Sequence, residues 1–321
     1  MSMRGLLRGF VVAGLAFALG GPAFAQAWPA KPVRIIVPFG PGGGTDIQGR
    51  LLAKKFLESM GQTFVVDNRA GAAGLIGAEL AAKSPPDGYT ILFTTASLSV
   101  NVSLYKKIAF DPLKDLAPVS WVSSVPLVLV VHPSVPAKSV KELIALAKKG
   151  RLTPGNNGAG TTSFLSVEMF NYFTGLSLPN IAYKGGGPAM TGLITGEVDF
   201  VFATALAAQP HIKSGKVRAL AVTTPKPAGV FPNLPTMNSI YPGFESDNWY
   251  AMFFPTGTPK EIVAKLNAEI VKALKSEEIR NFMVSEGADP VGSTPEELAA
   301  YFRKEIEKYA KLIKARNIPQ Q

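Results

Sequence analysis

Short hydrophobic runs alternate along the chain with longer segments in which apolar residues recur at helical spacing. Runs of this kind predict buried strands, and their alternation with amphipathic helices predicts parallel sheets covered by helices. The first such unit has predicted strands at 33–38, 63–67 and 89–93, with predicted helices at 46–60 and 75–83 between them. We therefore expect a β-α-β-α-β unit at the start of the folded protein.

The pattern begins again at a strongly apolar run. The strands predicted for this second unit are 125–131, 152–155, 180–183, 198–202 and 217–223, with helices between them. Residues 225–248 are rich in Pro, Gly and Asn and predict a long connection, after which a strand is expected at 249–254. The repeated pattern predicts an α/β protein with two lobes, each a mostly parallel sheet flanked by helices.

Two helices near the C-terminus are predicted from the residues that begin them. Thr258 is expected to cap the first, and Thr294 opens a capping box with Glu297 at the start of the second. No parallel strands accompany these helices, so we expect them to fold back onto the first lobe. The predicted domains are a signal peptide at 1–25, a first lobe at 26–124 and 249–321, and a second lobe at 125–248.

The N-terminus has the parts of a secretory signal peptide. Two arginines precede an apolar run at 10–19, and residues 23–25 form an A-x-A cleavage signal. The run is too short to span a membrane comfortably, which argues against a membrane anchor. We therefore expect a leader that is removed after Ala25 or Ala27, and a mature protein in the periplasm.

Composition argues against several kinds of site. The chain has no cysteine, which excludes disulfides and thiol chemistry. His132 and His211 are the only histidines, they lie far apart in the sequence, and no G-x-S-x-G motif is present. Neither a zinc site nor a hydrolase triad is expected from these residues. We therefore expect no metal and no catalytic residue.

Charge and glycine spacing argue against nucleic acids and nucleotides. The net charge of +10 comes largely from lysines dispersed among glutamates, which indicates a basic solvated surface that favours the approach of anions. A dinucleotide fingerprint beginning at Gly40 lacks its third glycine, because Thr45 stands at that position. The sequence therefore predicts no cofactor.

Four loops share one design, in which a hydrophobic strand ends, a glycine-rich loop follows and a helix begins. They span residues 40–46, 68–77, 158–163 and 185–189. In α/β sheets the ligand lies beyond the carboxyl ends of the strands, where each helix start presents free N–H groups and partial positive charge. Glycine lets the backbone approach the ligand closely. The loops therefore predict an anion site made largely of backbone groups.

Several motifs occur in a fixed order over nearly the whole mature chain. They are Trp28-Pro-x-Lys-Pro32, Pro38-Phe-x-Pro-Gly-Gly43 with Asp46, Asn68-Arg-x-Gly-Ala72, Pro85-x-Asp-Gly-Tyr89, Tyr183-Lys-Gly, Gly196-x-Val-Asp199 and Pro255-x-Gly-Thr-Pro259. Together they resemble the Bug (Bordetella uptake gene) proteins, the substrate-binding components of tripartite tricarboxylate transporters. The resemblance implies the two-lobed type II periplasmic-binding-protein fold with the ligand in the cleft between the lobes.

The resemblance also implies which residues bind the ligand. We expect a carboxylate to lie against the first loop and the loop that follows the second strand, with a second group of residues in the other lobe. The expected binding residues are Phe39, Pro41, Gly42, Gly43, Gly71, Ala72, Ser97, Asn101, Gly158, Ala159, Gly160, Thr161, Ser163, Tyr183 and, near the far end of the ligand, Asp199. Asp46 is instead expected to cap and charge the start of its helix.

The function implied by the resemblance is capture of a small carboxylate, such as a dicarboxylate, an amino acid or an aromatic acid. The protein would deliver this ligand to the membrane permease subunits of a tripartite tricarboxylate transporter. It is expected to act as a monomer, without nucleic acid and without catalysing a reaction. Two alternatives stay open, namely a periplasmic sensor that acts with a signalling receptor and an exported hydrolase.

Overall fold

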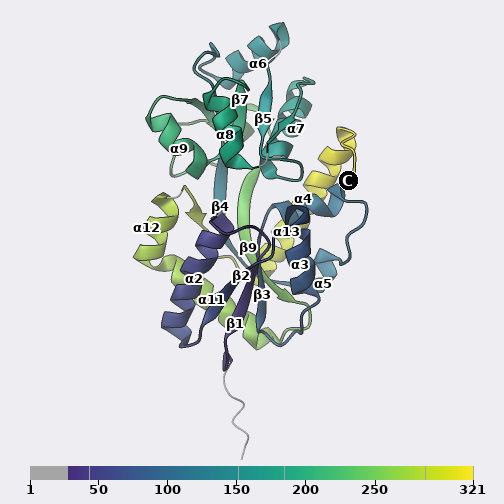
Figure 1. Ribbon diagram of the computed structural model, residues 1–321, viewed down its shortest axis with the longest axis vertical. Helices are drawn as coiled ribbons and strands as arrows, with labels where there is room; N and C mark the ends of the chain where they lie inside the picture. Colours follow the sequence, from purple (N-terminus) through teal and green to yellow (C-terminus); the bar gives the residue numbers. More distant parts are fainter. Residues whose placement is uncertain (1–27, 43, 151, 184, 286, 321) are drawn as a thin grey trace, which may run out of the picture.

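The protein has two lobes, one above the other, joined by long strands (Figure 1). The computed structural model describes residues 28–42, 44–150, 152–183, 185–285 and 287–320. The predicted signal peptide and Gly43 lie outside the described residues. Among the described residues, no helix combines the length and the apolar composition needed to cross a membrane.

The first lobe is built on a mixed sheet. Its strand order is β2-β1-β3-β9-β4, and the short β10 pairs with the other edge of β4. The strands are β1 (Val33–Val37), β2 (Phe64–Asn68), β3 (Thr90–Thr95), β9 (Asp247–Pro255), β4 (Leu116–Val131) and β10 (Asp289–Pro290). The first three are parallel, whereas β9 is antiparallel to both β3 and β4. Strand β9, which comes late in the chain, is thus inserted between β3 and β4 of the first-lobe sheet.

The second lobe begins where β4 leaves the first sheet. From Leu127 onward β4 pairs with β7 (Phe200–Thr204) and β8 (Arg218–Val222), both antiparallel to it. Beyond β7 lie β5 (Pro154–Asn156) and β6 (Ile181–Ala182), which run parallel to β7. Alternate residues of β4 enter two different cores on the two faces of this sheet. This explains why 127–131 is apolar at every position.

Helices cover both faces of both sheets. In the first lobe α2 (Gly44–Met60), α11 (Lys260–Lys275) and α12 (Glu277–Ser285) lie on one face, and α3 (Leu75–Ala82), α4 (Ser97–Leu104) and α13 (Pro295–Ala315) on the other. The second lobe has α6 (Val140–Lys149), α7 (Thr162–Thr174), α8 (Gly186–Ile194) and α9 (Ala205–Lys213). Single turns occur at α5 (Pro112–Asp115) and α10 (Met237–Ile240). The predicted two-lobed α/β fold is confirmed. The prediction that each sheet is mostly parallel is wrong, because β4 and β9 pair antiparallel to their neighbours.

Several features of the structure were not predicted, and three of them bear on the site. The helix α4 is buried on most sides, so it lacks the polar face that gives a helix its sequence pattern. The helix α12 was not separated from α11, and β4 extends back to Leu116 through a stretch that contains Pro118 and several serines. Both faces of this part of β4 are covered, and its register with β9 shifts twice. The sequence therefore lacks the regular alternation of apolar and polar residues that indicates a strand.

The two helix starts near the C-terminus differ from each other. The capping box of Thr294 and Glu297 is confirmed, since each side chain binds the backbone N–H of the other. The predicted cap at Thr258 is wrong. Its hydroxyl donates to the carbonyl of Pro255 at 2.8 Å, and the extended backbone of Pro259 makes the helix begin at Lys260.

The last helix, α13, touches both lobes (yellow in Figure 1). Its first half packs Leu298 and Phe302 into the core of the first lobe. Its second half packs Tyr309, Leu312 and Ile313 into a core that includes α7 and the sheet of the second lobe. The C-terminal helix therefore joins the two lobes as well as folding back onto the first.

Candidate functional site

A small cavity lies where the two lobes meet on the side of α2, α9 and α12. Its volume is about 120 Å³. The first lobe contributes the start of α2, the end of α12 and parts of β4 and β9, and the second lobe contributes the junction of β7 and α9. The lining residues are Gly44, Ile47, Gln48, Val125, Thr204, Leu206, Tyr250, Phe282, Met283 and Ala288. The cavity thus joins the start of a first-lobe helix to the carboxyl end of a second-lobe strand.

The polar side chains in this cavity are neutral. Burial raises the pKa of Tyr250 to about 12, so its phenol stays protonated at physiological pH, and its oxygen accepts a hydrogen bond from Asn248 at 3.1 Å. Gln48 accepts a hydrogen bond from the hydroxyl of Ser123 at 2.7 Å. A Cβ on Gly44 would lie 2.6 Å from the Tyr250 oxygen. Glycine is therefore required for α2 to start this close to β9.

Two predicted loops, 68–77 and 158–163, meet helix α4 on the side of α3 and α7. The side-chain amide of Asn101 donates to the carbonyl of Ala73 at 2.9 Å, which ties α4 to the loop before α3. Gly160 of the second lobe approaches the same place, because a Cβ there would lie 2.8 Å from Asn101 Oδ1 and 3.5 Å from the Cβ of Ala73. Asn101 is fully buried and its Oδ1 has no hydrogen-bond partner among the described residues. The predicted residues Asn101 and Gly160 are thus brought together.

The first loop is held in place by side chains from its neighbours. Asn68 donates to the carbonyl of Phe39 at 3.0 Å, and the backbone N–H of Gly42 donates to Asp46 Oδ2 at 2.9 Å. Gly42 has a φ of +80°, and both Pro41 and Gly42 are exposed. The loop therefore presents its backbone at the surface between the lobes.

Asp46 serves the helix, as the sequence predicted. Burial alone would raise the pKa of its carboxyl, but hydrogen bonds from Arg50 and from the Gly42 N–H leave this pKa below its ordinary value of 3.8. Arg50 pairs with Asp46 at 2.9 Å one turn further along α2. The negative charge of Asp46 is thus paired locally, with Arg50 and with the N–H of Gly42.

The loop before α3 has an unusual backbone. Gly71 has a φ of +140° and Ala72 a φ of +45°, and Ala73 is also left-handed with a φ of +50°. Non-glycine residues seldom adopt this conformation, and such strain occurs often at binding sites. A Cβ on Gly71 would overlap the side chain of Ile76, so the turn is packed against the start of its own helix.

Several predicted residues use their side chains within the second lobe. Ser163 is fully buried and its hydroxyl donates to the carbonyl of Phe202 at 2.7 Å. Thr161 caps α7, since its hydroxyl accepts from the N–H of Phe164 and donates to the carbonyl of Gly158. These contacts position the loop and leave its backbone as the part that can bind a ligand. Ala159 is exposed at the tip, and Ser97 is buried at the start of α4.

Tyr183 borders the loop at 158–163 through its backbone, since a Cβ on Gly158 would lie 3.1 Å from the carbonyl oxygen of Tyr183, whereas Asp199 lies apart from the loops. The ring of Tyr183 packs inside the second lobe, close enough that a Cβ on Gly155 would stand 3.1 Å from it. Asp199 precedes β7, at the end opposite to Thr204, and its carboxylate accepts from the N–H of Thr153 at 2.7 Å. Because the far end of β7 points away from the cleft, the structure does not bring Asp199 together with the other predicted residues.

Gly44 lies in the predicted loop 40–46, but the sequence did not point to the other residues that line the cavity. Thr204 directly follows a predicted strand and precedes a helix, so it satisfies the same geometric rule as the glycine-rich loops. No glycine marks this junction, unlike the four predicted loops. Leu206 and Ile47 carry no chemical signal in the sequence, and Phe282 belongs to a helix that was not predicted.

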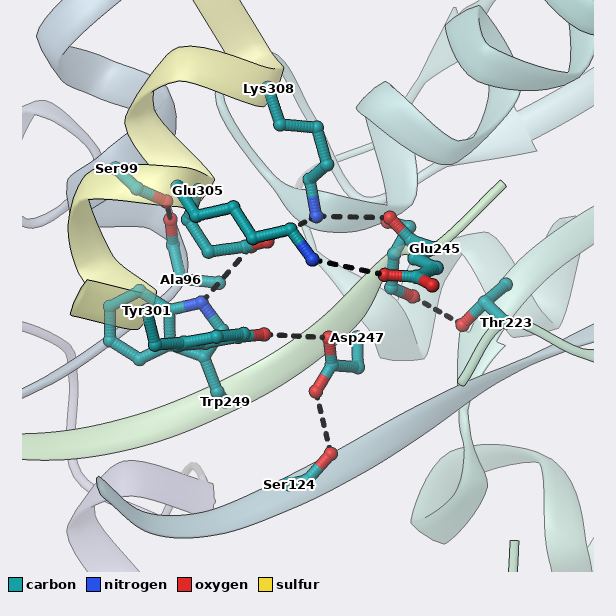
Figure 2. A network of polar contacts seen from close by, with 12 residues as sticks. Ala96, Ser99, Ser124, Thr223, Glu245, Asp247, Trp249, Tyr301, Glu305 and Lys308 are labelled. Atoms are coloured by element: carbon teal, nitrogen blue, oxygen red, sulfur yellow. Dashed lines mark hydrogen bonds and ion pairs between the residues drawn. The ribbon is translucent and has the colours of Figure 1, made fainter. Parts of the chain in front are cut away.

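A buried polar network lies beside the strands that join the lobes (Figure 2). Asp247 accepts hydrogen bonds from Ser124 at 2.6 Å and from Tyr301 at 3.2 Å. The indole N–H of Trp249 donates to Glu305, which also pairs with Lys308. The network thus connects β4, β9 and α13 at the point where the chain crosses between the lobes.

The charge state of this network depends on burial. Glu305 is 2% exposed, and desolvation raises the pKa of its carboxyl above the ordinary value of 4.5 despite the nearby Lys308 ammonium. Lys308 also donates to the carbonyl of Glu245 at 3.0 Å. No group of three or more metal-ligating side chains occurs in the part of the chain that the structure describes.

Comparison with known proteins agrees with this two-lobed site. Residues 49–318 match the model of the tripartite tricarboxylate transporter family receptor. The chain belongs to this family. Protein BugT of Bordetella pertussis is 39% identical over 322 residues, which cover 98% of each chain. The Bug-type resemblance of the motifs is therefore confirmed.

Solved structures show what members of the family are. The periplasmic binding protein BugD is 35% identical and superposes with a TM-score of 0.79, over 92% of this chain and all of BugD. A protein of R. palustris solved with adipate is 36% identical with a TM-score of 0.81, over 91% of this chain and 99% of that one. The family consists of periplasmic solute-binding proteins rather than enzymes.

Proposed function

We propose that this protein captures a small carboxylate between its two lobes and delivers it to the permease subunits of a tripartite tricarboxylate transporter. The observation that carries the proposal is the cavity in which Gly44 of one lobe and Thr204 of the other face the same space. A site shared by two lobes binds its ligand fully only when the lobes come together. The first lobe would consist of residues 26–124 and 249–321, and the second lobe of residues 125–248.

The carboxylate would be held mainly by backbone N–H groups. The first N–H groups of a helix such as α2 have no partner within the helix and carry partial positive charge, and the local acid Asp46 is already paired with Arg50. The exposed Gly42 lies directly in front of this helix start. Hydrogen bonds from N–H groups to an ionised carboxylate are stronger than those between neutral groups, which supports binding without a lysine or arginine at the site.

The proposed binding surface combines predicted residues with those that the cavity adds. It consists of Phe39, Pro41, Gly42, Gly43, Gly71, Ala72, Ser97, Asn101, Gly158, Ala159, Gly160, Thr204 and Tyr250, with Thr161 and Ser163 as supports of their loop. Tyr183 borders this surface through its backbone carbonyl, which lies beside Gly158. Asp199 is not included, because it precedes β7 at the end opposite to Thr204. The relative solved with adipate supports a carboxylate as the ligand class.

The proposed place of action is the periplasm. Residues 1–25 would direct export and be removed, and the mature chain would act as a monomer that docks on the permease. Membership in a family of periplasmic binding proteins supports this location.

A screen of organic acids tests the proposed function. Purified mature protein would be melted in the presence of mono- and dicarboxylates, amino acids and aromatic acids, with sugars and metal ions as controls. A ligand that binds only the native state raises the apparent stability, by about 2.7 kcal/mol at a concentration of about 100 times Kd. We expect stabilisation by at least one carboxylate, confirmed by calorimetry. Binding to a sugar or a cation with no response to any carboxylate would contradict the proposal.

A further inference from the structure

We propose that the ligand is a monocarboxylate whose uncharged, apolar tail enters the cavity between α2, α9 and α12. This inference rests on the proposed function and names the class of ligand within it. The carboxylate would lie toward the exposed first loop and the start of α2, and the tail would pass Gly44 toward the second lobe.

The lining of the cavity favours an apolar group. Ile47 enters from α2, Leu206 from α9, and Phe282 and Met283 from α12. Every described residue that lines the cavity is uncharged. A second carboxylate placed there would lose its hydration without gaining an ion pair, which is strongly unfavourable for a buried charge.

The polar groups that line the cavity do not need a charged partner. The oxygen of Tyr250 already accepts from Asn248, and Oε1 of Gln48 already accepts from Ser123. Because burial keeps the phenol of Tyr250 protonated, it offers a neutral donor and no negative or positive charge. The cavity therefore discriminates against a charged tail but tolerates a neutral one.

The size of the cavity limits the tail. A volume of about 120 Å³ is close to that of engineered apolar cavities of about 150 Å³ that hold benzene. A single ring or a short alkyl chain therefore fits, whereas a larger fused ring system would require the lobes to separate.

The contact between the lobes beside the cavity adds to this selectivity. A Cβ on Gly287, which precedes the lining residue Ala288, would lie 2.6 Å from the Cβ of Ala205, which precedes the lining residue Leu206. The lobes thus touch at one edge of the cavity, which narrows the access of water at that edge. The narrower access strengthens the preference for an apolar tail, since the free energy of burial scales with the apolar area removed from water.

Matched pairs of acids test the inference. Hexanoate and adipate share six carbons and differ by one terminal carboxylate, and benzoate and terephthalate differ in the same way. Calorimetry on the wild-type protein is expected to give a Kd at least about tenfold lower for the monocarboxylate in one of these pairs, equivalent to about 1.4 kcal/mol. Equal or tighter binding of the dicarboxylate in both pairs would overturn the inference while leaving the proposed function intact. Binding of no carboxylate at all would contradict both.

A charge placed in the cavity provides the second test. Leu206→Arg puts a cation at the lining, and Leu80→Arg on α3 is its control, because both leucines are 38% exposed and tolerate a polar head in solvent. We expect Leu206→Arg to weaken binding of the preferred monocarboxylate by about tenfold and to tighten that of its dicarboxylate partner, and Leu80→Arg to change neither. Circular dichroism confirms folding. Unchanged binding of both acids to Leu206→Arg would show that the tail does not enter this cavity.

Discussion

Gly287, at the end of α12, lies so close to Ala205, at the start of α9, that a Cβ on Gly287 would stand 2.6 Å from the Cβ of Ala205. The first residue belongs to one lobe and the second to the other. Gly287 also has a left-handed backbone with a φ of +73°. This contact fixes how closely the lobes can approach beside the cavity.

Replacing Gly287 by alanine should therefore hold the lobes apart. The left-handed backbone costs an alanine about 1–2 kcal/mol, and the added methyl group meets Ala205 in addition. We expect Gly287→Ala to weaken binding of the best carboxylate by about tenfold or more, because overpacking costs about 1–3 kcal/mol. Calorimetry measures the affinity, and small-angle scattering with bound ligand measures closure.

Gly61→Ala is the matched control. Gly61 has a similar φ of +70° and open space around it, so the substitution brings the backbone strain without the contact between lobes. We expect Gly61→Ala to lower the melting temperature and leave the affinity unchanged. Equal affinities for the two variants would show that the contact between Gly287 and Ala205 has no part in closure.

A second pair of glycine substitutions tests whether the close approach of the loop at 158–163 to Asn101 contributes to ligand binding. Gly160 has a φ of +78° and faces Asn101, whereas Gly175 at the end of α7 has a φ of +68° and faces open space. We expect Gly160→Ala to reduce carboxylate affinity by about tenfold, again through overpacking, and Gly175→Ala to reduce only stability, by about 1–2 kcal/mol. If both variants bound ligand as the wild type does, the loop at 158–163 would not belong to the site.

Ser163 tests whether a predicted binding residue is structural. Its buried hydroxyl satisfies the carbonyl of Phe202, so Ser163→Ala should lower the free energy of unfolding by about 1–3 kcal/mol. Ser84→Ala removes a similar bond, to the carbonyl of Leu80, at the surface and should cost less than about 0.5 kcal/mol. Urea unfolding gives these values, and we expect ligand affinity to be the same in both variants. A large loss of affinity in Ser163→Ala alone would assign its hydroxyl to the ligand.

Glu305 gives the protein a dependence of stability on pH. Desolvation raises the pKa of its folded-state carboxyl above 4.5, and Asp247 adds to this rise while Lys308 opposes it. The tyrosines Tyr301 and Tyr309 also face Glu305, and burial raises the pKa of each well above its usual range, so both remain neutral.

The sign of the effect follows from proton release. Between pH 4.5 and the raised pKa the unfolded chain loses the proton and the folded chain keeps it, so stability falls as pH rises through this window. Glu305→Gln cannot lose a proton, and the free energy of unfolding of this variant relative to wild type should therefore increase with pH across the same window. Urea titrations at several pH values measure this difference. Parallel pH profiles for the two proteins would mean that Glu305 titrates alike in the folded and unfolded chain.

The sequence by itself determined the layout of the strands and the loops that end them. Periodic apolar residues specified most helices, and short apolar runs specified strands such as those predicted at 33–38 and 125–131, because burial against covering helices leaves a local pattern. Elements without such a pattern were missed, as in α4, whose sides are nearly all buried.

Tertiary structure alone decided which of these loops share a site. Gly44, Thr204 and Tyr250 come together because β9 inserts beside β3 and β4, an antiparallel pairing between distant segments that leaves no trace in local sequence. Asp199 stays outside, since direction along β7 decides which end of the strand faces the cleft. The apolar lining of the cavity cannot be predicted from the sequence for the same reason. Ile47 and Leu206 carry no signal that sets them apart from other hydrophobic residues, and only the packing of the two lobes brings them to one cavity.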